Sequence, residues 1–171
     1  MKNPIIRLFA VITALILLFP HISCSQKPVQ QMYYEIKIYS VPKPGQAESV
    51  DKYLEDALLP ALHRNGIKNV GAFKPIEADT ANFGKFVFVF IPYGTGEKYI
   101  GLDALLEKDA VYQGAAKSFI AAPYDKPPFA RYESIFLKAF KGMPQMKVPS
   151  FSTSPAERIY ELRSYESQTE E

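Results

Sequence analysis

Cysteine is almost absent from this sequence, and its single occurrence lies near the N-terminus. Cys24 is the only cysteine among 171 residues. Every residue after it therefore belongs to a chain without a thiol. This excludes a disulfide framework, thiolate catalysis and a cysteine-ligated metal from the folded part of the protein.

Histidine is nearly as scarce, and runs of like charge are missing. Beyond residue 24 the one histidine is His63, and no spacing of His63 with carboxylates supplies the converging ligands of a nonhaem metal site. Lys2 and Arg7 lie in the N-terminal segment, which leaves 18 basic and 18 acidic residues in the remainder. Phosphate-backbone binding needs a concentrated cationic surface, so we expect no nucleic-acid partner.

Residues 1–24 have the pattern of an export signal. Lys2 and Arg7 form a positive region, and residues 8–19 (LFAVITALILLF) form an uncharged apolar run. A membrane-spanning helix needs about 20 apolar residues, so this run is too short to span a bilayer but fits a signal peptide.

The end of this segment resembles a lipoprotein signal. Ser23 is a small residue directly before Cys24, which would then be acylated, whereas His21 stands where an aliphatic residue is usual. Cleavage by a general signal peptidase, with Cys24 incidental, and a retained anchor are the alternatives. We expect an exported protein, either a periplasmic or outer-membrane-attached lipoprotein or otherwise secreted, that contacts a membrane only through a lipid anchor.

Residues 32–141 follow the pattern of one α+β domain after a polar tether at residues 25–31. Strands are expected at residues 33–41, 70–76, 85–91 and 130–140, and helical regions at 46–65 and 102–121. Pro60 should kink or divide the first helical region, Gly66 should end it, and Asp109 should restart a turn in the second. This β-α-β-β-α-β order predicts a ferredoxin-like domain, with helices on one face of a four-stranded antiparallel sheet.

The strands of this domain carry more apolar residues than one covered face can bury. The first strand alternates, with Tyr34, Ile36 and Ile38 on one face and Glu35 and Lys37 on the other. Residues 85–91 (KFVFVFI) are apolar on both faces. An exposed apolar sheet usually marks an interface. For this strand alone, burial in the centre of the sheet is the alternative.

A strand-like motif recurs near the C-terminus. Residues 142–158 contain three prolines and form a linker. Residues 159–166 (IYELRSYE) then repeat residues 33–40 (YYEIKIYS) at a constant offset of 126 positions. The repeat predicts that residues 159–171 begin a second, incomplete copy of the domain. A C-terminal strand that extends the first sheet is the alternative.

Four segments carry a resemblance to a known family: YYEIKIYSV, LPALHRNGIKNVGAFKPI, APYDKPPFARYESIFLKAF and ERIYELRSYES. They resemble the NIPSNAP group of the dimeric α/β-barrel superfamily, in particular its exported bacterial members. The resemblance covers residues 32–171 and implies a C-terminally truncated chain, because the better-defined NIPSNAP domain would begin near residue 157. It also implies that the sheet packs face to face with a like sheet, from a second copy or from the missing second domain.

The resemblance fixes no reaction, because the superfamily includes haem-degrading and small-molecule monooxygenases as well as members without known chemistry. We identify no catalytic residue and no metal ligand set, and no cofactor is evident, although haem stays open. Tyr39, His63, Arg131 and Tyr132 are candidates for lining a pocket. For each a structural role is the alternative, such as a half-exposed helix end for His63 or cross-strand pairing of Glu35 and Glu133 with Lys37 or Arg131.

Two functional hypotheses follow from these observations. The first is an exported, noncatalytic binding or assembly module at the cell envelope. The second is a small-molecule or haem-handling enzyme of the monooxygenase type. An apolar cavity with His63 or Arg131 pointing inward would favour the enzyme, and a filled core with an apolar outer sheet face would favour the module.

Overall fold

The computed structural model describes residues 29–154, 157–165 and 168–169 of the chain. The expected signal segment and its Cys24 lie outside these residues. Within the described part, no helix is long and apolar enough to cross a membrane.

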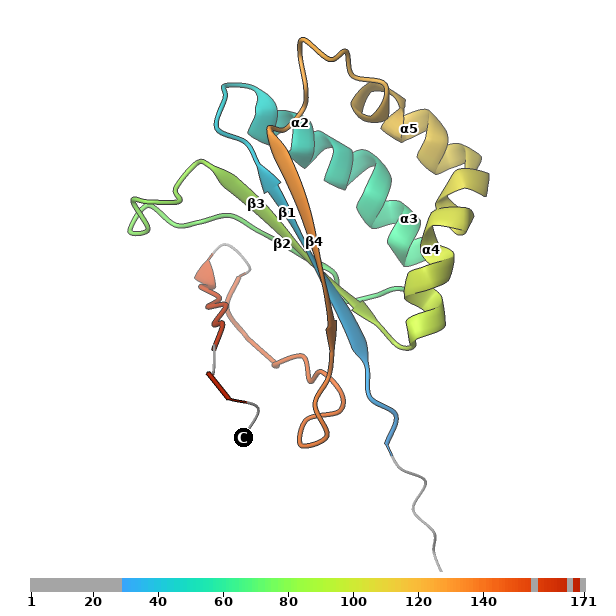
Figure 1. Cartoon of the computed structure of the whole chain (residues 1–171), viewed down its shortest axis with the longest axis vertical. Coiled ribbons are helices and arrows are strands. Elements are labelled where there is room, and N and C mark those ends of the chain that lie inside the picture. The colour runs from blue at the N-terminus through green and yellow to red at the C-terminus, as the bar shows by residue number, and fades with distance from the viewer. Residues whose placement is uncertain (1–28, 155–156, 166–167, 170–171) are drawn as a thin grey trace, which may run out of the picture.

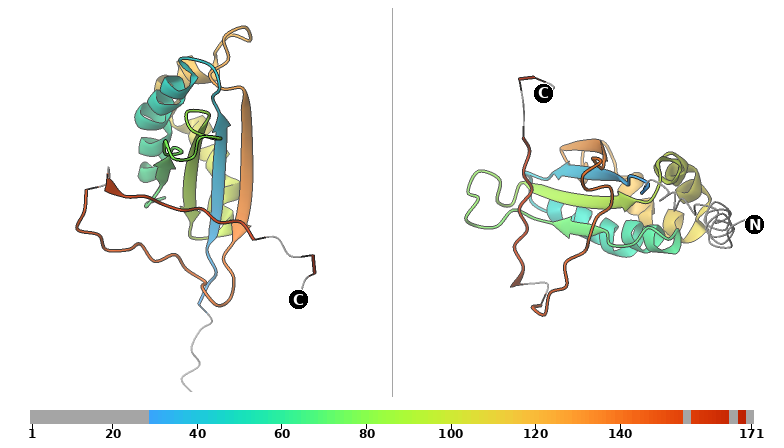
Figure 2. Two further views of the ribbon diagram at one scale, coloured as in Figure 1. Left: turned by 90° about the vertical axis from the view of Figure 1, so that its left-hand side faces the viewer. Right: turned by 90° about the horizontal axis from the view of Figure 1, so that it is seen from below.

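A four-stranded antiparallel sheet forms one layer of the domain and the helices form the other (Figures 1 and 2). The sheet order is β2-β3-β1-β4, and every neighbouring pair is antiparallel. The elements are β1 (Tyr33–Ser40), α2 (Gln46–Tyr53), the π-helical segment η1 (Leu54–Leu58), α3 (Leu59–Arg64), β2 (Gly71–Phe73), β3 (Phe86–Tyr93), α4 (Gly96–Lys108), α5 (Ala110–Ile120) and β4 (Arg131–Lys138). This arrangement confirms the predicted ferredoxin-like α+β fold.

The first helical region is divided where Pro60 predicts it. Proline has no backbone N–H and cannot continue the α-helical hydrogen-bond ladder. The wider π-helical turn of η1 lies directly before it, and the Leu59 N–H bonds the carbonyl of Leu54. The region ends at Gly66, whose φ is +71°, with Ile67 N–H donating to the Leu62 carbonyl at 2.9 Å. Gly66 therefore closes the helix as expected.

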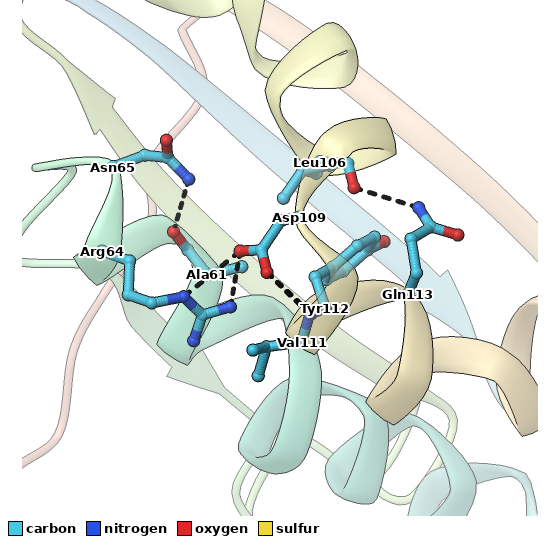
Figure 3. A network of polar contacts seen from close by, with 8 residues as sticks. All are labelled: Ala61, Arg64, Asn65, Leu106, Asp109, Val111, Tyr112 and Gln113. Carbon is cyan, nitrogen blue, oxygen red and sulfur yellow. Dashed lines mark hydrogen bonds and ion pairs between the residues drawn. The ribbon is translucent and has the colours of Figure 1, made fainter.

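The second helical region divides at Asp109, which caps the N-terminus of α5 (Figure 3). Asp109 Oδ1 accepts hydrogen bonds from the N–H groups of Val111 and Tyr112, each at 3.0 Å. Its Oδ2 lies 2.6 Å from Nη2 of Arg64 at the end of α3. The pKa of Asp109 is held below its ordinary value, first by the hydrogen bond from the Tyr112 N–H and then by the hydrogen bond from the Arg64 guanidinium. One carboxylate thus caps a helix and links it to another.

The core fills the space between the helices and one face of the sheet. Strand β3 supplies Val87, Val89, Ile91 and Tyr93, all of them buried. The first helical region supplies a stripe of buried aliphatic side chains: Val50, Leu54, Leu58 and Leu62. Each fully buried aliphatic side chain of this size contributes roughly 1.5–3 kcal/mol of transfer free energy. The alternate set of β3 side chains points to the opposite face of the sheet.

Candidate functional site

Strand β1 turns its charged residues toward the helices and its apolar residues away from them. Residues directly opposite one another in an antiparallel pair lie on the same face. Glu35 lies opposite the buried Ile91, and Lys37 lies opposite the buried Val89. The charged face of β1 is therefore the covered face of the sheet.

Glu35 is the centre of a buried polar network on this face. Glu35 is only 2% exposed. Oε2 accepts a hydrogen bond from the Tyr93 hydroxyl at 2.7 Å, and Oε1 accepts one from the Ser134 hydroxyl at 2.6 Å. Lys37 Nζ lies 2.8 Å from Oε1. The carboxylate is thus satisfied by β1 itself and by both strands that flank it.

Lys37 completes the network as the cationic partner. Its Nζ donates to the Tyr132 hydroxyl at 2.8 Å. Burial alone would raise the pKa of Glu35 and lower that of Lys37, but the opposite charge and the hydrogen bonds outweigh burial in both residues. The pKa of Glu35 is therefore below its ordinary value, and that of Lys37 is above it. Both shifts describe a stable ion pair.

This ion pair corrects the expected cross-strand pairing. Glu35 pairs with Lys37 along β1, and Arg131 pairs with Glu133 along β4 at 2.8 Å. The register explains the difference, because the residues opposite Lys37 are Val89 and Ser134, and the residue opposite Arg131 is Ser40. No opposite charge faces either cation across a strand. The side chain two residues away on the same face is the available partner.

The four predicted pocket residues do not converge. Tyr39 and Tyr132 lie side by side on the covered face, with ring centroids 5.2 Å apart. His63 is exposed near the end of α3, and Arg131 lies on the opposite face of the sheet from Tyr132. In the described part of the chain, no three His, Cys, Asp or Glu side chains gather as a metal site would require. The structure thus brings two of the four residues together, as part of the packing around Lys37.

The network includes two residues that the sequence did not single out as partners of Glu35, namely Tyr93 and Ser134. Their contacts depend on strand register, which alternation alone leaves undefined when β3 is apolar on both faces. The sequence does hold a partial signal that Glu35 and Lys37 face the core. Tyr33 and Tyr39 alternate onto the same face of β1, and both pack against the core.

The other side of the sheet, which we call the open face, has no helix over it (Figure 2). Its side chains alternate with the core set and are almost all apolar: Tyr34, Ile36 and Ile38 of β1, Phe73 of β2, Phe86, Phe88 and Phe90 of β3, and Ile135 and Leu137 of β4. Most are half-buried, whereas Ile135 and Leu137 are 41% and 39% exposed. The predicted two-sided apolar sheet is therefore present.

Part of the open face lies beneath the C-terminal segment, residues 157–165. The ring centroids of Tyr160 and Phe73 lie 5.0 Å apart. A hollow of about 470 Å³ separates the segment from the sheet, with Ile36, Phe88 and Phe90 among its lining residues. Residues 159–165 pair with no strand in the part of the chain described, so they do not extend the first sheet here. The segment passes crosswise over the β2 side of the sheet instead (Figures 1 and 2).

Comparisons with known proteins support the fold without assigning an activity. No family model matches the chain, and no curated protein matches it either. Among solved structures, a NIPSNAP family protein from Agrobacterium tumefaciens str. C58 is 15% identical with a TM-score of 0.51, over 67% of this chain and 91% of that one. A NIPSNAP-like domain protein from Burkholderia xenovorans is 18% identical with a TM-score of 0.50, over 75% and 99%. The chain therefore has a NIPSNAP-like fold.

Proposed function

We propose that this protein is an exported binding and assembly module whose open face packs against the open face of a second copy. The observation that carries the proposal is the open face itself, a continuous apolar surface contributed by all four strands. Soluble monomers rarely leave a large contiguous apolar patch in water. Two such sheets can pack face to face at about 10 Å with their side chains interdigitated.

The composition of the open face favours a like surface as its partner. Its centre is aliphatic and aromatic, and the charged pair Arg131–Glu133 lies toward one end of β4. An apolar centre with a polar margin is the usual anatomy of a protein interface. The covered face, by contrast, holds the hydrogen-bonded ion pair and the buried core. A linked domain of the same fold would offer the same kind of surface.

Sedimentation equilibrium of the chain from residue 25 onward tests the association. We expect a dimer that dissociates when Phe88→Lys places a charge in the centre of the open face. Leu105→Lys is the matched control, because Leu105 is exposed on α4 in the helix layer. Circular dichroism should show that both variants fold. A monomeric parent chain, or equal dimerisation of the two variants, would contradict the proposal.

Export and lipid anchoring form the second part of the proposal, supported by the sequence pattern of residues 1–24. Expression of the full chain in a bacterial host with labelled palmitate tests it. We expect label on the protein and partition into the detergent phase of Triton X-114, both lost in Cys24→Ala. An unlabelled protein that stays in the cytoplasm would exclude export, and an unlabelled protein in the medium would exclude the anchor alone.

A further inference from the structure

Strand β4 has a free outer edge. It is the last strand in the sheet order, and among the described residues it pairs only with β1. All eight of its residues are exposed, and apolar side chains flank the edge on both faces, with Ile135 and Leu137 on the open face and Phe136 on the other. The unpaired N–H and C=O groups of such a strand are a template for another strand.

The opposite edge of the sheet is a poorer template. Strand β2 spans only Gly71–Phe73, and Pro75 follows it closely without an N–H to donate. The C-terminal segment already lies against it through Tyr160 and Phe73. The β4 edge is therefore the longer and more accessible of the two.

Residues 159–165 carry the side-chain pattern of the strand that β4 already accepts. Each of the eight β1 residues has a partner in β4, with Tyr34 opposite Leu137 and Ile36 opposite Ile135. Tyr160 and Leu162 stand at the matching positions of the repeat. The ion pair is repeated as well, because Glu161 and Arg163 lie 2.7 Å apart, two residues apart in the chain as Glu35 and Lys37 are.

Residues 159–165 nevertheless pair with no strand in the described part of the chain. Leu162 is 69% exposed and Tyr165 is 83% exposed. Tyr160 packs on Phe73, but an alternating strand that pairs with no neighbouring strand is not stable in water by itself. The segment thus has a strand's sequence and lacks a strand's environment.

We propose that residues 159–165 of one copy add as a strand to the outer edge of β4 in a second copy. The segment lies beside β2, and the accepting edge is at the other side of the same sheet (Figure 1). A segment can therefore reach the β4 edge of a neighbour while its own domain stays intact. Such a contact joins unlike surfaces and produces a head-to-tail assembly, or a closed pair when two copies exchange segments.

The added strand would cover the exposed side chains on both faces of β4. If the added strand alternates as β1 does, Tyr160 and Leu162 lie beside Ile135 and Leu137 on the open face. Glu161 and Arg163 then lie on the other face, beside Phe136, which is 43% exposed and stacks with Tyr33 and Tyr99. Main-chain hydrogen bonds supply affinity and the alternating side chains set the register, as in other cases of strand addition.

Disulfide trapping between two preparations tests the pairing. A chain that starts at Gln26 contains no cysteine, so each copy can carry one introduced thiol. Leu162→Cys in one preparation should couple to Ile135→Cys or Leu137→Cys in the other at least tenfold faster than to Leu105→Cys on α4. Equal coupling to the β4 and α4 positions would overturn the proposal. A chain with both Leu162→Cys and Ile135→Cys that closes internally at high dilution would also overturn it.

A proline variant separates this edge contact from the open-face association proposed above. Leu162→Pro removes an N–H and the strand geometry at a residue outside the folded core, so the melting temperature should not change. We expect a lower weight-average mass than the parent chain, with Ser152→Pro in the linker as the control. An unchanged mass would refute strand addition. If Phe88→Lys leaves the mass unchanged while Leu162→Pro lowers it, only the open-face proposal fails.

Discussion

Glu35 and Lys37 occupy positions where a core usually has apolar side chains. A buried ion pair gains little over well-packed apolar residues, but removal of one partner leaves an uncompensated charge. Here the pair also joins strands, because Ser134 and Tyr132 of β4 bond to Glu35 and Lys37 of β1. We infer that its main structural role is to hold β4 in register on β1.

A double-mutant cycle tests this role. Glu35→Ala should lower the free energy of unfolding by about 3 kcal/mol, because it strands the Lys37 ammonium beneath the helices. Lys37→Ala should cost a similar amount. The double variant Glu35→Leu/Lys37→Met should be less destabilised than either single variant, since no charge is left unpaired. Urea denaturation measures all three, and single variants within about 0.5 kcal/mol of the parent, the range of ordinary surface substitutions, would contradict the inference.

The same pair makes stability depend on pH at both ends of the scale. The pKa of Glu35 is lowered from 4.5, so its contribution is complete above that value and is lost as the pH falls through the folded pKa. The pKa of Lys37 is raised from 10.5, so its contribution is complete below that value and is lost as the pH rises through the folded pKa. Thermal denaturation should therefore give a plateau between these values.

A variant of Glu35 identifies the source of the loss of stability on acidification. Glu35→Gln should flatten the decrease in melting temperature on acidification, because the residue no longer titrates. Asp56→Asn is the control, since its pair with Lys52 is on the surface and contributes little. Acid sensitivity that is identical in the parent and in Glu35→Gln would show that other carboxylates dominate.

The sequence could predict the alternation of these side chains but not their partners. Tyr34, Ile36 and Ile38 were expected to share a face, and they do. The sequence did not show which face of the sheet the helices cover, because the side chains of β3 are apolar on both faces. Pairing of Glu35 with Lys37, and not with a charge across a strand, follows from a register that single-sequence patterns leave open.

At the scale of elements, local chemistry was more informative. The division at Pro60 and the stop at Gly66 follow from a missing N–H and from a positive φ, and both were expected. Strand β2 is shorter than the predicted residues 70–76. Pro75 explains this, because a residue without an N–H cannot extend the ladder to β3.

The Asp109 cap predicts a stability difference between two carboxylates of the second helical region, one that caps a helix and one that is exposed. Asp109→Ala removes the acceptor for two N–H groups of α5 and the partner of Arg64, so it should lower the melting temperature by roughly 4 °C. Asp103→Ala, on the exposed side of α4, should leave it nearly unchanged. Differential scanning calorimetry compares the two. Equal melting temperatures would mean that α5 does not need this cap.

At the scale of the whole molecule, the described part of the chain contains one buried core and two incompletely covered apolar surfaces. Every buried residue of the core cluster lies between Tyr39 and Ala116, and β4 and the C-terminal segment contribute none of them. The open face and the β4 edge are the places where this fold can still bury apolar surface. The open face could be predicted from the sequence, because its strands carry apolar residues on both faces. The β4 edge could not, because it depends on the order of the strands in the sheet.

Deletion of residues 151–171 should therefore leave the domain folded. The deleted residues pack through Tyr160 against Phe73 on the open face, and the Arg158–Phe151 contact lies entirely among them. We expect an unchanged far-ultraviolet spectrum and a melting temperature within about 2 °C of the parent, since the core loses no side chain. We also expect stronger binding of the dye anilinonaphthalene sulfonate, because Phe73 and the lining of the hollow beneath Tyr160 become accessible. A cooperative loss of structure would instead place the C-terminal segment within the folding unit, and unchanged dye binding would mean that the segment does not cover the open face in solution.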